Sequence, residues 1–224
     1  MTTFLLVPGA GCDPSYWNPV VAELAERGHR GIAVDLPCDD DSADLPAYAE
    51  AVAAQHHDDG TRPVVVAHSL GGFTGPLACP LVDAQALIYV SGMIPRPGEP
   101  PGDWWEATGC AAAQRRMADM DGYDVDDMDA LFYNGVNPGV VAGVVERDQS
   151  DTPMLAPWPA DALPDLPTRF VLLRDDRFFP EGFMRTVVAE RLGVEPVVAP
   201  GGHMAMLSHP RELIERLVDI TVDS

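Results

Sequence analysis

The feature that most constrains this chain is the sequence AHSLGG at residues 67–72, which directly follows three valines and precedes a stretch with helical character. β-Branched residues favour an extended strand. Small residues two before and two after Ser69 allow the chain to turn sharply from that strand into a helix, so that the serine hydroxyl stands clear of the backbone. We therefore expect a strand at 63–67, a helix at 70–81 and a candidate nucleophile at Ser69.

Strand and helix patterns alternate along most of the chain. Such alternation indicates a mostly parallel sheet with helices on both faces. At 224 residues the chain suits one domain with a sizeable core, and we expect a single domain over residues 1–224. The other strands are expected at 3–7, 31–35, 86–90, 168–173 and 195–199, and the other helices at 18–27, 46–57, 181–192 and 209–220.

The segment at residues 95–167 interrupts this alternation. It is rich in Pro, Gly, Met and Asp and carries three of the four tryptophans. We expect a helical cap, inserted after the fourth predicted strand, that walls a substrate pocket and excludes water. An alternative is that the large apolar side chains here only pack the cap against the core. The candidate substrate-binding residues in and around this segment are Trp104, Trp105, Trp158, Met93, Phe178 and Met204.

The chain carries acids and a histidine after later strands. Asp175 and Asp176 follow the predicted strand at 168–173, and His203 follows the short predicted strand at 195–199. Because the carboxyl ends of parallel strands meet at one edge of a sheet, we expect these side chains to lie near the candidate nucleophile. An imidazole can take a serine proton near neutral pH, and a carboxylate that accepts its N–H fixes the tautomer. Only one of the two adjacent aspartates can point toward the histidine.

The loop after the first predicted strand can supply hydrogen-bond donors. The sequence PGAG at residues 8–11 follows the apolar strand at 3–7, and its small residues let a backbone N–H approach a developing oxyanion. We expect the main-chain amides of Ala10 and of Leu70 to be the two donors. An ordinary tight turn is the alternative interpretation of this loop.

Four segments together carry a resemblance to a known family. They are VPGA at residues 7–10 with Trp17 downstream, AHSLGG at 67–72, YVSGMIP at 89–95 and GHMAMLS at 202–208. These segments resemble the plant methylesterase and hydroxynitrile lyase group of α/β-hydrolases and its bacterial esterase relatives. The resemblance implies an α/β-hydrolase fold, with a mostly parallel sheet flanked by helices and a cap after the fourth predicted strand.

The resemblance also implies roles for individual residues. It assigns Ser69, His203 and Asp176 to a catalytic triad, and the amides of Ala10 and Leu70 to an oxyanion hole. Asp176 is preferred to its neighbour because its position ahead of a proline matches the acid loop of these relatives. The chain is then expected to be a serine hydrolase that cleaves a small to medium apolar ester through an acyl-enzyme, with no cofactor and no metal.

Three departures from the relatives bear on the reaction. Pro8 stands where the relatives usually carry histidine, and proline has no N–H to donate. Gly9 stands where the lyases tend to carry threonine or asparagine. The chain has no lysine, whereas one type of hydroxynitrile lyase holds the departing cyanide with a cap lysine. Pro8 bears on the geometry of the loop, whereas Gly9 and the absence of lysine disfavour a lyase. The alternatives to a hydrolase are a lyase, acyltransferase or cyclase of specialised metabolism, or a ligand receptor.

Charge and cysteine content limit the partners. A formal net charge of −21 and a pI near 4.3 argue against binding to nucleic acid or to an anionic membrane surface. The four cysteines (Cys12, Cys38, Cys79 and Cys110) have no CxxC spacing, and no secretory signal precedes the apolar start at residues 4–7. We therefore expect a cytoplasmic protein with free thiols. The sequence leaves open whether the chain forms a homo-oligomer.

Overall fold

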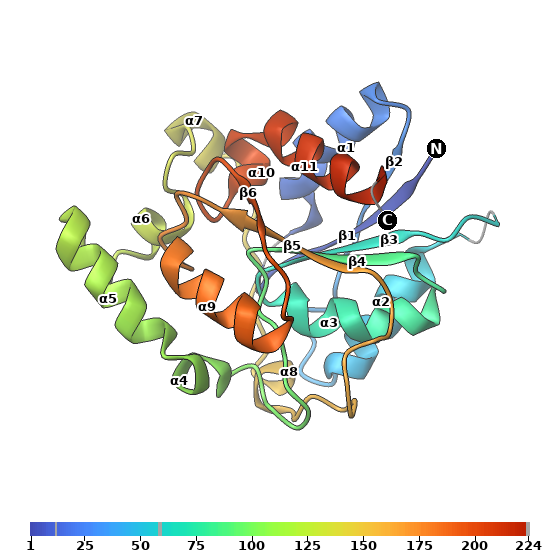
Figure 1. Ribbon diagram of the computed structural model, residues 1–224, viewed down its shortest axis with the longest axis horizontal. Helices are drawn as coiled ribbons and strands as arrows, with labels where there is room; N and C mark the ends of the chain where they lie inside the picture. The colour runs from blue at the N-terminus through green and yellow to red at the C-terminus, as the bar shows by residue number, and fades with distance from the viewer. Residues whose placement is uncertain (12, 58–59, 223–224) are drawn as a thin grey trace.

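The computed structural model describes residues 1–11, 13–57 and 60–222 and contains a six-stranded sheet with helices on both faces (Figure 1). Every neighbouring pair of strands is parallel, and the strand order is β2-β1-β3-β4-β5-β6. The predicted α/β fold is thus confirmed, with a sheet that is wholly parallel over the described residues. The strands are β1 (Thr3–Val7), β2 (Arg30–Ala33), β3 (Val64–His68), β4 (Ala86–Val90), β5 (Thr168–Leu173) and β6 (Val197–Ala199).

The central strands are buried on both faces. All residues of β1, β3 and β4 are buried, which is typical of parallel strands covered by helices on each side. Successive side chains of a strand point to opposite faces, so Val65 joins one apolar cluster while Val64 and Val66 join the other. Two cores therefore hold the sheet between two layers of helices.

The flanking helices divide between these two cores. Helices α2 (Leu45–Gln55), α3 (Gly71–Ala78) and α9 (Glu181–Arg191) pack on one face, and α1 (Asn18–Glu26) and α11 (Pro210–Val222) pack on the other. Figure 1 shows these two layers below and above the sheet. The short elements of the core are η1 (Pro14–Trp17), η2 (Cys79–Leu81) and α10 (Ala205–Ser208).

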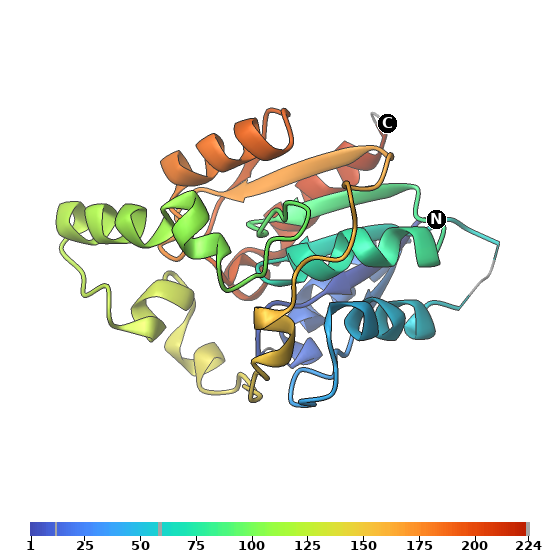
Figure 2. The same cartoon turned by 90° about the horizontal axis from the view of Figure 1, so that it is seen from below.

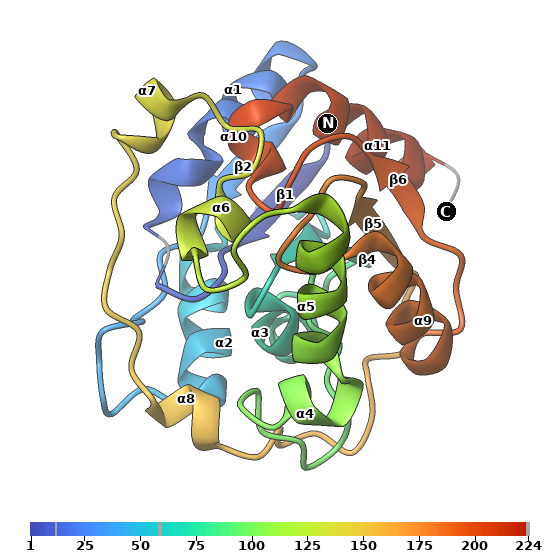
Figure 3. The same ribbon diagram turned by 90° about the vertical axis from the view of Figure 1, so that its left-hand side faces the viewer.

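The segment between β4 and β5 forms the predicted helical cap. Figures 2 and 3 show α5 (Cys110–Asp121) and α6 (Met128–Phe132) across the carboxyl ends of the strands. An ion pair between Glu99 and Arg191, whose side chains are 11% and 3% exposed, ties the start of the segment to α9. The cap helices are α4 (Trp104–Thr108), α5 (Cys110–Asp121), α6 (Met128–Phe132), α7 (Pro138–Val141) and α8 (Thr152–Leu155).

The sequence predicts that the cysteines are free thiols. Cys38, Cys79 and Cys110 are buried free thiols, whereas Cys12 lies outside the described residues and its free thiol stays a prediction. Within the described part of the chain, no helix is both long enough and apolar enough to span a lipid bilayer.

Candidate active site

Ser69 occupies a strained turn between β3 and α3. Its φ of 51° lies in the left-handed region, which is uncommon for any residue other than glycine. The backbone N–H groups of Gly72 and Met93 donate to the Ser69 carbonyl at 3.0 and 2.9 Å and hold this conformation. A Cβ at Gly71 would lie 2.5 Å from the Pro8 carbonyl oxygen, and one at Gly72 would lie 2.0 Å from that of Met93. Only residues without a side chain therefore fit at the start of α3, where it packs against the backbone of Pro8 and of Met93.

His203 joins Ser69 to Asp176. Its Nε2 lies 3.0 Å from Ser69 Oγ, and its Nδ1 lies 2.9 Å from Asp176 Oδ2. The imidazole and the carboxylate are fully buried. A hydroxyl in contact with a base that is itself oriented by a carboxylate is the arrangement required of an activated nucleophile.

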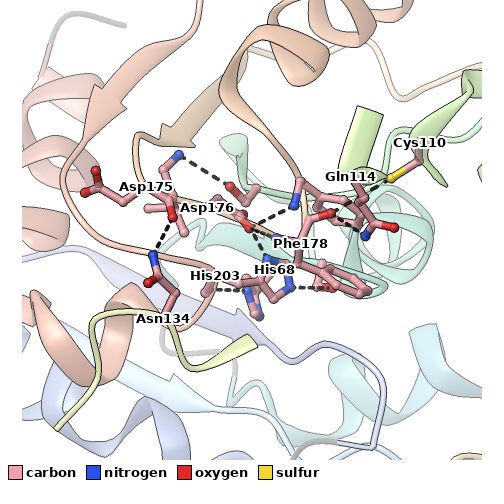
Figure 4. Close-up of polar contacts among 12 residues, drawn as sticks. His68, Cys110, Gln114, Asn134, Asp175, Asp176, Phe178 and His203 are labelled. Carbon is pink, nitrogen blue, oxygen red and sulfur yellow. Dashed lines mark hydrogen bonds and ion pairs between the residues drawn. The ribbon is translucent and has the colours of Figure 1, made fainter. Parts of the chain in front are cut away.

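The surroundings of Asp176 suit a buried negative charge. Its Oδ1 accepts the backbone N–H groups of Phe178 and Phe179 at 2.9 and 2.8 Å, while Oδ2 accepts the imidazole N–H of His203 (Figure 4). These three N–H donors replace much of the hydration that the carboxylate loses on burial.

Asp175 faces a different loop. Its Oδ2 accepts the Gly201 N–H at 3.0 Å, and its own N–H donates to the Gly201 carbonyl. The Asn134 side-chain amide donates to the Asp175 carbonyl at 2.9 Å (Figure 4). The structure therefore brings Asp176, and not Asp175, to His203, while Asp175 braces the loop that carries the imidazole.

His68 connects the loops on both sides of Ser69. The His68 Nε2 lies 3.1 Å from the His203 carbonyl, and its Nδ1 lies 3.0 Å from the Tyr16 hydroxyl, which also accepts the Gly9 N–H at 3.3 Å. Because a carbonyl can only accept, the His68 proton resides on Nε2, and Nδ1 accepts from Tyr16. Burial and the neighbouring His203 hold the pKa of His68 well below its usual value. A neutral imidazole thus links the loop that contains Gly9 to the loop that contains His203.

A small cavity of about 60 Å³ with mostly apolar walls lies over Ser69 and His203. Ala10 and Leu70, the expected oxyanion donors, are in its wall, together with three of the six predicted substrate-binding residues, Met93, Trp105 and Phe178. A second cavity of about 260 Å³ adjoins it, and Met204 lies in the wall of that cavity. Phe132 and Met154 also line the small cavity and were not predicted.

Trp104 and Trp158 line neither cavity. Both are buried, and their indole N–H groups donate to the carbonyls of Ile94 at 3.2 Å and Phe73 at 3.0 Å. They pack the cap against the core, which was the alternative to a role in substrate binding.

Phe178 links the cap to the acid loop. The Gln114 side-chain amide on α5 donates to the Phe178 carbonyl at 2.8 Å (Figure 4). The Phe178 ring lies 4.8 Å from the His203 ring and 4.1 Å from the Phe132 ring, centroid to centroid. Phe178 therefore contacts Asp176, His203 and two helices of the cap.

Comparison with known proteins identifies the family of this chain. The profile of the alpha/beta hydrolase family matches residues 4–216. The chain belongs to the alpha/beta hydrolase family. Ser69, Asp176 and His203 all lie within the matched residues.

Similar alpha/beta hydrolases come from plants. Norfluorocurarine synthase 2 of Strychnos nux-vomica is 25% identical, over 97% of this chain and 94% of that protein. Among solved structures, polyneuridine aldehyde esterase has a TM-score of 0.76 and 22% identity, with 99% of each chain covered. The methylesterase MES16 of Arabidopsis has a TM-score of 0.72 and 17% identity over the whole of both chains. These likenesses confirm the predicted fold and the resemblance to plant members of the family.

Proposed function

We propose that this alpha/beta hydrolase is a serine esterase that cleaves a small to medium apolar ester through an acyl-enzyme on Ser69. The observation that carries the proposal is the continuous set of contacts from Ser69 Oγ through His203 to Asp176, at the floor of a cavity with mostly apolar walls. No cofactor is needed for this reaction, because the nucleophile, the base and the acid all come from the chain.

In the acylation step, Ser69 Oγ attacks the ester carbonyl carbon while its proton passes to His203 Nε2. The C–O bond to the alcohol then breaks, and the imidazolium returns the proton to the alcohol oxygen. In the deacylation step, water gives its proton to His203 and its oxygen to the acyl carbon, and Ser69 recovers its proton as the acid leaves. The sum is one ester and one water converted to one acid and one alcohol.

The amides of Ala10 and Leu70 are the proposed oxyanion donors. Both residues border the cavity beside Ser69, and Leu70 immediately precedes α3, whose N-terminal dipole favours negative charge. Each effective donor of this kind lowers the barrier by about 3 kcal/mol in acyl-transfer enzymes.

The names of the relatives support ester chemistry and also suggest an alternative. Polyneuridine aldehyde esterase and methylesterase MES16 are named as esterases, whereas norfluorocurarine synthase 2 is named as a synthase. A non-hydrolytic reaction on the same triad is therefore the second candidate. Incorporation of ¹⁸O from labelled water into the acid product identifies hydrolysis, and its absence during turnover identifies the alternative.

Turnover of p-nitrophenyl acetate tests the proposal. The wild-type protein should release p-nitrophenol, and Ser69→Ala should lose nearly all of this activity with an unchanged circular dichroism spectrum. Ser42→Ala is the matched control, because Ser42 is exposed and its hydroxyl contacts only Asp40 among the described residues. Substantial turnover by Ser69→Ala would rule the proposal out.

A further inference from the structure

The two cavities beside Ser69 differ in size and share part of their walls. We call the cavity of about 60 Å³ the inner chamber and that of about 260 Å³ the outer chamber. Ala10 and Phe132 line both. An ester bound with its carbonyl at Ser69 therefore has a separate chamber available for each of its halves.

The inner chamber is the smaller of the two. Its volume is about 60 Å³, against about 260 Å³ for the outer chamber. Its walls include the apolar side chains of Met93, Trp105, Met154 and Phe178. A short, uncharged group therefore fits it better than a long one.

The outer chamber is larger and opens to solvent. Met128, Asp129 and Glu146 in its wall are exposed. A backbone hydrogen bond of 2.7 Å from Arg147 N–H to the Gly11 carbonyl fixes its wall to the oxyanion loop. The chamber is therefore built into the fold and connects the reaction centre to water.

The chemistry of the proposed reaction indicates which half enters which chamber. After acylation the acyl group stays bonded to Ser69, whereas the alcohol must depart and water must enter. The outer chamber is the larger of the two and has exposed residues in its wall, so it offers the alcohol a path to solvent. The departing alcohol therefore fits the outer chamber, and the acyl group fits the smaller inner one.

Resting on the proposed esterase function, we infer that the substrates of this enzyme are short-chain acyl esters of larger, predominantly apolar alcohols, and that Phe132 separates the two halves. Its ring lies 4.1 Å from that of Phe178 and 5.2 Å from that of His203, so it is fixed at the boundary between the chambers. Phe132 is then a specificity-determining residue that limits the length of the acyl group.

Two isomeric esters test this inference. Benzyl acetate and methyl phenylacetate contain the same atoms, but the large group lies on the alcohol in the first and on the acid in the second. The wild-type kcat/KM for benzyl acetate should exceed that for methyl phenylacetate by about tenfold or more, the scale on which a poorly fitting apolar group is rejected. An equal preference, or a preference for methyl phenylacetate, would overturn the inference.

Variants at the boundary test the role of Phe132. Phe132→Ala merges the chambers and should move the ratio of the two kcat/KM values toward methyl phenylacetate by about tenfold, with Phe132→Leu intermediate. Phe183→Ala is the matched control, because Phe183 packs against Trp104 and lines neither chamber, so its ratio should stay as in the wild type. If Phe132→Ala is unfolded, the role of Phe132 is tested by comparing the ratio of the two kcat/KM values in Phe132→Leu with that in the wild type. An unchanged ratio in the folded Phe132 variants would exclude this residue as the boundary.

The outcome is separable from that of the proposed function. Loss of p-nitrophenyl acetate turnover in Ser69→Ala supports the esterase function whichever isomer is preferred. A wild-type enzyme that turns over p-nitrophenyl acetate but prefers methyl phenylacetate would overturn only the present inference, whereas a chain that cleaves none of the three esters would overturn both.

Discussion

Two adjacent aspartates have different tasks because their side chains point to different loops. The carboxylate of Asp176 holds the imidazole of His203, and that of Asp175 holds the backbone of Gly201. The sequence makes both aspartates candidates for the acid. The resemblance to the relatives favours Asp176, and the side-chain contacts of the structure show which carboxylate lies against His203.

The first prediction at this scale concerns the acid. Asp176→Asn should lower kcat for p-nitrophenyl acetate by about four orders of magnitude, because the amide leaves the imidazole in the wrong tautomer. Asp175→Asn should cost far less, since its side chain does not contact His203. Steady-state kinetics of the two variants checks this, and the reverse ranking would transfer the role of the acid to Asp175.

The second prediction concerns the neutral state of His68. Its pKa is lowered by burial and by His203, so below the usual value of 6.5 the unfolded chain takes up a proton that the folded chain does not. The free energy of unfolding should therefore fall as the pH drops below 6.5, with His68 contributing up to about 1.4 kcal/mol per pH unit. Urea unfolding between pH 7 and pH 5 measures this.

His68→Gln provides the comparison for that experiment. The variant lacks the titrating imidazole, so its stability should decline less steeply with falling pH than that of the wild type. Other groups titrate equally in both proteins and cancel in the difference. Identical slopes would show that His68 is not held neutral.

At the scale of whole elements, the sheet and its large helices follow from the sequence. The predicted strand at 63–67 is found as Val64–His68, because consecutive valines fit a strand buried on both faces. Helices α4, α6, α7 and α8 have only four or five residues, and so show no helical periodicity. Two of them begin at a side-chain cap: Asp127 accepts the Ala130 N–H at the start of α6, and Asn137 accepts the Gly139 N–H at the start of α7.

The site also contains residues that a local sequence pattern predicts and residues that no such pattern predicts. Ser69 and His203 were predictable because each lies in a local motif after a strand. The contacts of His68 with Tyr16 and with the His203 carbonyl join residues 52 and 135 positions apart. A single sequence carries no signal for such contacts beyond the place of His68 next to Ser69.

The contact between α5 and the acid loop leads to a third prediction. Gln114→Ala removes the donor to the Phe178 carbonyl, so the acid loop should lose part of its support. We expect kcat to fall by about tenfold, the equivalent of one buried hydrogen bond of roughly 1.4 kcal/mol. Gln85→Ala is the matched control, because Gln85 also donates to a backbone carbonyl, that of Arg62, on the surface. Equal kinetics for the two variants would contradict a link between the cap and the triad.

At the scale of the whole molecule, the dominant property is the net charge of −21. A surface potential of this sign attracts cations and repels anions over distances set by the ionic strength. The active site opens toward that surface through the outer chamber, where Asp129 and Glu146 are exposed. The charge should therefore influence how fast charged esters are captured.

The fourth prediction compares acetylcholine with 3,3-dimethylbutyl acetate, an uncharged ester of the same shape. Raising the salt concentration from about 0.01 M to about 1 M shortens the screening length from about 30 Å to about 3 Å. The kcat/KM for acetylcholine should fall severalfold over this range, and that for the neutral ester should change little. A parallel salt response of both esters would contradict electrostatic attraction.

The central claim is that Ser69 becomes covalently acylated because His203 activates it. A fluorophosphonate reacts with such a serine and leaves one stable adduct, which intact-mass analysis counts and peptide mapping locates. We expect one adduct per chain, on Ser69, formed much more slowly in His203→Ala and absent from Ser69→Ala. A folded wild-type protein that stays unlabelled, or that carries the adduct on another residue, would contradict it.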